Sequence, residues 1–311
     1  MAALHRSVGF ASINSEGTRA GIDDMTRLAD ISQQPQDATS HETLYVSGGD
    51  LFSLGHYPGN PIYPGVLLLD HLLQLSVKLT SRTLGMAASA KAVDRIQFLA
   101  PVLPGDVVSL DASIKAMDAG SATVTATASV RGEIHARATI TCGCTPPAAE
   151  PLPSLDMPDA AQALSHRDIA RVLPHRYPFL LLDRIHTYRA GASIRASKVI
   201  HRDSPLLGRN APANYPSGLA IESLGQAGIA LCFLSRSDVS PADILLGAIS
   251  GVELLRPIPF DTVLTLEGRI ERLLDNAMVL SGAVLVGQEP VIRVGNLVAM
   301  IDQRHAPNSN T

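Results

Sequence analysis

Residues 55–70 read Gly-His-Tyr-Pro-Gly-Asn-Pro-Ile-Tyr-Pro-Gly-Val-Leu-Leu-Leu-Asp. The first part of this stretch is rich in glycine and proline, which predicts a rigid turn. The apolar run that begins at Val66 predicts a helix that is opened by the preceding Pro-Gly pair. A histidine, His56, and a carboxylate, Asp70, flank this junction fourteen positions apart.

A weaker copy of this stretch lies in the second half of the chain. Residues 215–222 read Tyr-Pro-Ser-Gly-Leu-Ala-Ile-Glu, which places Glu222 at the position of Asp70 and Gly208 at the position of His56. Gln74 matches Gln226 and Pro101 matches Pro257 at a spacing of roughly 152 to 156 residues. The repeat predicts an internal duplication.

The composition is that of a globular chain with room for two hydrophobic cores. The chain has 311 residues, of which 46% are hydrophobic and 17% charged, and a net charge of −4, which gives no sign of a nucleic-acid surface. The three cysteines form neither a disulfide framework nor a zinc set, so we expect reduced thiols and a cytoplasmic location. We also expect no secretory signal and no apolar run long enough to span a membrane.

The pattern along the chain predicts two α+β units. The runs from Val66 to about Arg82 and from Leu219 to Leu234 are apolar on most of their circumference, which predicts helices wrapped by a sheet. Residues 121–130 alternate hydroxyl and apolar side chains, which predicts a strand with one wet face. We expect a first domain with a polar N-terminal extension over 1–144, a proline-rich linker over 145–164, and a second domain with a short tail over 165–311.

The two acids, Asp70 and Glu222, lie in apolar helices. Burying an ionised carboxylate without a partner costs several kcal/mol, so such a residue normally has hydrogen bonds or a chemical role. The pattern alone leaves both roles open. Gln74 and Gln226 follow the acids by four residues and so share their helical face, where an amide can orient the carboxyl group.

His56 also has two readings. A histidine beside glycine and proline is often only a structural loop residue. Here the turn would hold the backbone rigidly, and the first-turn amides of Gly65 and Val66 would be free donors at the positive end of a helix dipole. A histidine, an acid and free amides form a set suited to chemistry on a thioester.

Residues 55–67 resemble the active-site motif of the bacterial 3-hydroxyacyl-acyl carrier protein dehydratases, with His56 at the catalytic histidine. Residues 173–185, Leu-Pro-His-Arg-Tyr-Pro-Phe-Leu-Leu-Leu-Asp-Arg-Ile, resemble a second signature of that family, and residues 97–106 extend the resemblance. The resemblance implies a double hotdog fold, in which two curved antiparallel sheets each wrap around a long central helix. The division of histidine and acid between the halves also resembles polyketide synthase dehydratase domains.

The resemblance further implies one working site built from both halves. His56 of the first half and Glu222 of the second would be the catalytic pair, whereas Asp70 and Gly208 would form a relic site, because glycine cannot act as a base. His175 would be a structural residue that lines the substrate channel. We expect the substrate to contact Tyr63, Gly65, Val66, Ser217, Gly218 and Gln226.

The implied reaction is the removal of water from a 3-hydroxyacyl thioester on the phosphopantetheine of an acyl carrier protein, giving the trans-2-enoyl thioester in fatty-acid or polyketide and polyene biosynthesis. No metal or redox cofactor is expected, and neither nucleic acid nor membrane is an expected partner. Arg176, Arg202 and Arg209 would form a basic rim at the cavity entrance that faces the acidic carrier protein. The sequence leaves open whether the protein forms a homo-oligomer. The alternatives are enoyl thioester hydration or isomerisation, a thioesterase, and a noncatalytic acyl-binding or assembly partner.

Overall fold

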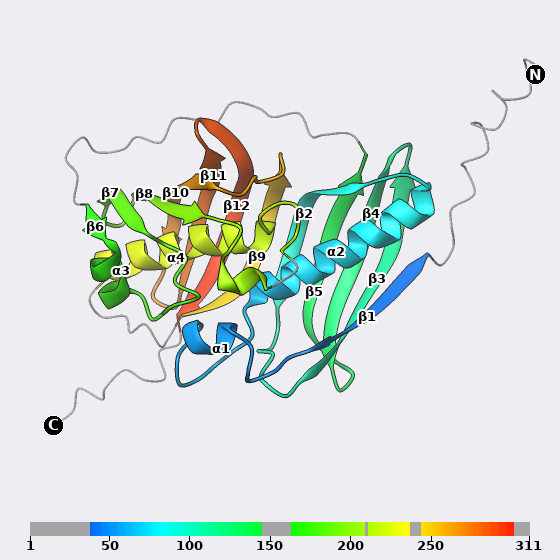
Figure 1. Ribbon diagram of the computed structural model, residues 1–311, viewed down its shortest axis with the longest axis horizontal. Coiled ribbons are helices and arrows are strands. Elements are labelled where there is room, and N and C mark those ends of the chain that lie inside the picture. Colours follow the sequence, from blue (N-terminus) through cyan, green and yellow to red (C-terminus); the bar gives the residue numbers. More distant parts are fainter. Residues whose placement is uncertain (1–37, 145–162, 209–210, 237–243, 302–311) are drawn as a thin grey trace, which may run out of the picture. The chain divides into compact units, whose positions relative to one another are not determined.

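The computed structural model describes residues 38–144, 163–208, 211–236 and 244–301 (Figure 1). The first half holds β1 (Thr39–Tyr45), α1 (Phe52–Gly55), α2 (Gly65–Leu84), β2 (Ser89–Phe98), β3 (Val107–Asp118), β4 (Ser121–Val130) and β5 (Glu133–Gly143). The second half holds β6 (Leu164–Ser165), α3 (His166–Val172), β7 (Arg184–Arg189), β8 (Ser193–Ile200), the 3₁₀ turn η1 (Pro205–Leu207), α4 (Ser217–Ser235), β9 (Ile244–Leu254), β10 (Thr262–Leu273), β11 (Ala277–Val286) and β12 (Glu289–Ile301).

All of these strands join in one antiparallel sheet. Its twelve strands run in the order β1-β3-β4-β5-β2-β9-β12-β11-β10-β8-β7-β6. The halves meet where β2 pairs with β9, with Val93 opposite Val252 and Ile96 opposite Ile249. The two predicted hotdog sheets are therefore present, and the β2–β9 pairing makes them a single continuous sheet.

The two long helices are built alike. Each has a proline as its N-cap, Pro64 for α2 and Pro216 for α4. The tyrosine before each proline donates its backbone N–H to a matching carbonyl, from Tyr63 to Val102 at 2.8 Å and from Tyr215 to Ile258 at 2.9 Å. This likeness in local structure supports the duplication inferred from the sequence.

Both helices pack against the sheet, and their apolar sequences follow from that position (Figure 1). The predicted helices begin and end within two residues of α2 and α4. The predicted strand over 121–130 is β4, whose alanine and valine side chains are buried while its hydroxyl side chains are half-buried. Alternation of this kind arises because successive side chains of a strand point to opposite faces.

The expectation that no apolar run could span a membrane is wrong. The 19 residues of α4 are long and apolar enough to do so by length and composition. However, 78% of this segment is buried inside the protein, and the core helix of a globular protein has the same properties. The helix is apolar all round because the sheet and neighbouring helices cover it.

The predicted domain boundaries stay predictions. The described residues 38–144, 163–208, 211–236 and 244–301 belong to one compact unit. Most of the polar N-terminal extension, nearly all of the proline-rich linker and the C-terminal tail lie outside the described residues.

Candidate active site

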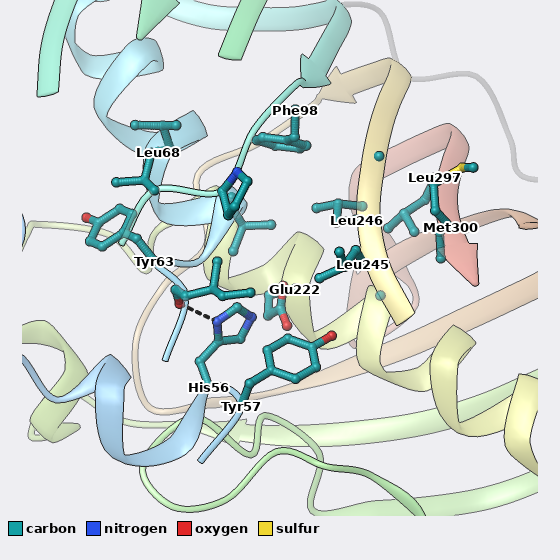
Figure 2. Close-up of a pocket in the computed structure, with 18 of the residues that line it drawn as sticks. His56, Tyr57, Tyr63, Leu68, Phe98, Glu222, Leu245, Leu246, Leu297 and Met300 are labelled. Atoms are coloured by element: carbon teal, nitrogen blue, oxygen red, sulfur yellow. Dashed lines mark hydrogen bonds between the residues drawn. The ribbon is translucent and has the colours of Figure 1, made fainter. Parts of the chain in front are cut away.

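A cavity of about 260 Å³ lies between the two halves. Its polar end carries His56 and Tyr57 from the first half and Glu222 from the second (Figure 2). His175, also from the second half, lines the same cavity. The rest of its wall is largely apolar and includes Tyr63, Leu68, Phe98, Leu245, Leu246, Leu297 and Met300. The cavity thus offers a few polar groups at one place and a long apolar surface beside them, as small-molecule sites commonly do.

His56 follows α1, and its backbone N–H donates to Phe52 O at 2.7 Å. Its ring Nδ1 lies 2.7 Å from Ile62 O. Because a carbonyl can only accept, Nδ1 carries the hydrogen, and the lone pair of the neutral ring is on Nε2. Burial lowers the pKa of His56 to about 4, although the bond to Ile62 partly offsets this effect. His56 is therefore a neutral base near pH 7.

Glu222 lies on the second turn of α4 and shows the opposite shift. Burial raises the pKa of Glu222 to about 7, although a hydrogen bond from Gln226 Nε2 to Glu222 Oε1, at 3.1 Å, partly offsets this effect. A substantial share of Glu222 is thus protonated at neutral pH. Ring nitrogens of His56 and His175 and a carboxyl oxygen of Glu222 all lie within 4.8 Å of one another. A neutral base and a partly protonated acid therefore meet in one cavity.

Gln226 does not line the cavity, so its predicted contact with substrate is a correction. The side chain is fully buried, and it accepts a hydrogen bond from Leu181 N at 2.8 Å. Its Nε2 donates to Phe179 O at 2.9 Å as well as to Glu222. Gln226 therefore fixes the position of Glu222 and ties it to the segment 179–181.

Tyr63, Gly65 and Val66 line the cavity, as the sequence predicts. The N–H groups of Gly65 and Val66 open α2, and within the described part of the chain neither has a hydrogen-bond acceptor. A Cβ atom on Gly65 would lie only 2.8 Å from the ring of Phe98, so a larger residue would displace this wall. The start of α2 can thus present free donors to a bound carbonyl group.

Ser217 and Gly218 are absent from the cavity wall, which corrects a second prediction. The N–H of Gly218 donates to Asp70 Oδ1 at 2.8 Å. A Cβ atom on Gly218 would lie 2.3 Å from Val66 O and 2.5 Å from Asp70 Oδ2. These residues lie where the starts of the two helices meet, and only glycine allows this close approach.

This contact explains the predicted relic site. Gly218 of the second half matches Val66 of the first half. The N–H of Gly218 already donates a hydrogen bond to the side chain of Asp70, which comes from the first half. The position that matches His56 is Gly208, which has no side chain and is exposed. The second copy therefore has no base, and its helix-start N–H group at Gly218 is not free to bind a substrate.

Asp70 supplies a prediction about stability. Burial raises the pKa of Asp70 to about 7. Protonation therefore favours the folded state, and this stabilisation is lost as the pH rises from the unfolded value near 4 towards 7. Asp70→Asn keeps an acceptor for Gly218 but cannot ionise. Between pH 5 and 8, we expect Asp70→Asn to gain about 2–3 kcal/mol in unfolding free energy relative to the unmodified protein.

Urea unfolding at both pH values measures this difference, and dehydration kinetics provide the control. The variant should keep most of its activity because Asp70 lies outside the cavity wall. A stability difference that is the same at pH 5 and pH 8 would show that Asp70 titrates as an ordinary carboxyl group.

Two residues at the polar end have more prominent places than the sequence indicated. His175, expected only to line the channel, has its Nε2 atom 3.6 Å from Glu222 Oε1. Tyr57, which was not among the predicted site residues, lines the cavity and donates its hydroxyl hydrogen to Ile244 O. Its position next to His56 in the motif was the available signal, but its neighbour across the halves could not be read from the sequence.

The expected basic rim is only partly available to a partner. The Arg176 guanidinium donates to Leu173 O and His175 O. The Arg202 guanidinium donates to Pro212 O and Ala213 O and lies 4.5 Å from the Phe260 ring centre. Arg209 lies outside the described residues. Both described arginines thus stabilise their own loops.

His56, His175 and Glu222 carry atom types that bind zinc. Ligand atoms around a tetrahedral zinc ion are only about 3.3 Å apart, because the bonds to it are about 2.0–2.1 Å long. The three ligand atoms lie within 4.8 Å of one another, a limit wider than that spacing, and His175 Nε2 is 3.6 Å from Glu222 Oε1. Their arrangement fits an acid and a base better, and we assign them no metal.

Comparisons with known proteins show the family of the chain. A family model described as ApeI-like, ApeI dehydratase, matches residues 32–136. The 3-hydroxyacyl-acyl-carrier-protein dehydratase FabZ of Variovorax paradoxus is 34% identical over 142 residues, which are 44% of this chain and 94% of that protein. The chain belongs to the FabZ dehydratase family. The resemblance drawn from residues 55–67 and 173–185 is thereby confirmed, and the chain is a dehydratase.

Solved structures extend the comparison to both halves of this FabZ family member. A trans-AT polyketide synthase dehydratase domain from Brevibacillus brevis matches with a TM-score of 0.62 and 14% identity, covering 85% of this chain and 93% of that one. A putative thioesterase from Novosphingobium aromaticivorans matches with a TM-score of 0.60 and 11% identity, covering 86% and 97%. At such low identity the matches show the fold alone, and they confirm the double hotdog.

Proposed function

We propose that the chain removes water from a 3-hydroxyacyl thioester at one site, with His56 as the base and Glu222 as the acid. The observation that carries the proposal is the meeting of these two side chains, one from each half, within 4.8 Å of one another. Burial favours the neutral form of both groups, so that near neutral pH one can accept a proton and the other can donate one.

In the proposed reaction, His56 Nε2 takes the proton from C2 of the substrate. The C2–H electron pair forms the double bond to C3, and the C3–O bond breaks. Glu222 gives its proton to the departing hydroxyl group, which leaves as water. The free N–H groups of Gly65 and Val66 would donate hydrogen bonds to the thioester carbonyl oxygen and stabilise the negative charge that develops on it.

The elimination leaves His56 protonated and Glu222 ionised. Within 4.8 Å, and with an effective dielectric constant of about 20, two opposite charges attract by at least about 3 kcal/mol. This attraction offsets part of the cost of charging His56 in a buried place. Transfer of the proton from His56 back to Glu222, directly or through the product water, restores the starting state.

We further propose that the substrate arrives on the phosphopantetheine of an acyl carrier protein. The support is the name of the relatives, which are 3-hydroxyacyl-acyl-carrier-protein dehydratases. The apolar side of the cavity, which includes Ile229, Leu246 and Met300, suits an acyl chain rather than a polar group. Phosphopantetheine would then be part of the substrate, and the proposed step uses no other cofactor.

The test is to incubate the protein with a 3-hydroxyacyl carrier protein and with the matching pantetheine thioester, and to follow the product by mass. Loss of one water with retention of the thioester is the expected result. Release of a free acid and a thiol would instead indicate a thioesterase, the activity named for one structural neighbour. No turnover on several chain lengths would favour a noncatalytic partner. Starting from the enoyl thioester reveals whether hydration or isomerisation dominates.

A further inference from the structure

We propose that His175 is a positioning residue that fixes which oxygen of Glu222 carries the acidic proton. This inference rests on the proposed function, because it assigns a role relative to the acid. His175 comes from the loop after α3, and 1% of its surface is exposed. Its Nε2 atom lies 3.6 Å from Glu222 Oε1.

The same oxygen of Glu222 receives the hydrogen bond from Gln226 Nε2 at 3.1 Å. Oε1 therefore lies near two nitrogen atoms, Gln226 Nε2 and His175 Nε2. A protonated carboxyl group has one oxygen that donates and one that accepts. With N–H groups directed at Oε1, the proton belongs on Oε2, which leaves Oε1 as the acceptor.

The hydrogen of His175 can be assigned from its surroundings. Nδ1 of His175 is buried, and no hydrogen-bond partner for it is found among residues 38–144, 163–208, 211–236 and 244–301. A buried N–H without an acceptor is costly, so the neutral ring places its hydrogen on Nε2, where Glu222 lies. Burial, together with the nearby His56 and Arg176, lowers the pKa of His175 to about 3 and keeps the ring neutral.

The backbone around His175 is held to both proposed catalytic residues. Arg176 N donates to Gly55 O, next to His56, at 2.9 Å. A Cβ atom on Gly55 would lie 2.2 Å from Arg176 O, so this contact requires a glycine. At the other end of the segment, Gln226 holds Phe179 and Leu181. The position of His175 is therefore set by the same contacts that set the acid and the base.

The 3.6 Å separation is longer than a hydrogen bond. As Glu222 loses its proton during the reaction, the growing charge attracts the N–H of His175 and shortens the contact. Other polar groups near Glu222 among the described residues are His56 and Tyr57 from the turn after α1, Tyr215 from the segment before α4, and Gln226 from its own helix. The Nε2 atoms of Gln226 and His175 lie 3.1 Å and 3.6 Å from Oε1.

The test compares His175→Phe with His175→Gln in the full chain. Phenylalanine keeps a ring beside Phe179 but has no N–H group, whereas glutamine can place its amide nitrogen near the position of Nε2. We expect His175→Phe to lower kcat by about 10- to 100-fold, with KM nearly unchanged, and to move the alkaline limb of the pH profile to higher pH. His175→Gln should restore most of kcat and the original limb.

Two results would overturn the inference. One is a His175→Phe variant with unchanged kcat and alkaline limb, and the other is a His175→Gln variant as impaired as His175→Phe. Nitrogen-15 NMR of the unmodified protein gives a readout that needs no variant, and a hydrogen found on Nδ1 rather than Nε2 would also overturn it. If variants of His56 and Glu222 are inactive while His175→Phe has normal activity, only this inference is rejected. If variants of His56 and Glu222 are active, the proposed function itself is rejected.

Discussion

Replacing His56 by asparagine is expected to lower kcat/KM for dehydration by about 10²- to 10⁴-fold, the usual contribution of a general base. Asparagine can place its amide nitrogen near the position of Nδ1, so the 2.7 Å contact with Ile62 O can persist. The variant lacks the imidazole ring with its basic Nε2 atom, including the ring contacts with Tyr57 and Phe179. The fold around the turn should therefore survive while proton removal from C2 fails.

Exchange of the C2 hydrogen in deuterated water measures that step separately from the loss of water. The unmodified protein should catalyse exchange into substrate or product, and His56→Asn should not. Thermal unfolding serves as the control for folding. If His56→Asn kept more than about a tenth of the activity, another group would be the base, and His175 would be the first candidate because it lies in the same cavity.

Replacing Glu222 by glutamine is expected to lower kcat by a similar factor, about 10²- to 10⁴-fold, because the amide cannot protonate the leaving hydroxyl group. Glutamine has nearly the same shape as glutamic acid, so it can keep the contact with Gln226. A 3-fluoroacyl thioester provides a sharp control, since fluoride is a much weaker base than hydroxide and needs less help from an acid. Glu222→Gln should recover much of its activity on that substrate, whereas His56→Asn should not.

The pH profile gives an independent check on Glu222. Its pKa is raised to about 7, and the proposed reaction needs the protonated form. Activity should therefore fall as the pH rises through about 7. It should also fall at low pH, where His56 becomes charged. Any residual activity of Glu222→Gln should no longer fall as the pH rises through about 7. If it still falls there, a group other than Glu222 causes the decrease.

Much of the fold could be predicted because its signals are local. The apolar run after Gly65 and the strict alternation over 121–130 each reflect the burial of one element, and both were located within two residues. The continuous sheet could not be predicted in this way. It depends on β2 pairing with β9, and that pairing joins segments of the chain about 150 residues apart.

The site shows the same division. The pairing of His56 with Glu222 could be predicted from the family resemblance of residues 55–67 and 173–185, and from the glycine that the second half has at the position of His56. The amide of Gly218 has the same position in its motif as Val66, yet its use by Asp70 depends on how closely the two helices approach. The contact of His175 with Glu222 likewise depends on a loop that folds back against α1. Such contacts come from tertiary packing, which a repeat does not encode.

The covalent connection between the two halves has a consequence for dilution. A site assembled from separate subunits is lost when those subunits dissociate, so its specific activity falls at low protein concentration. Here His56 and Glu222 lie on one chain, on either side of the β2–β9 pairing, and the partner half is always present at a high effective concentration. Activity per mole of chain should therefore stay constant on dilution, and one chain should provide one complete site.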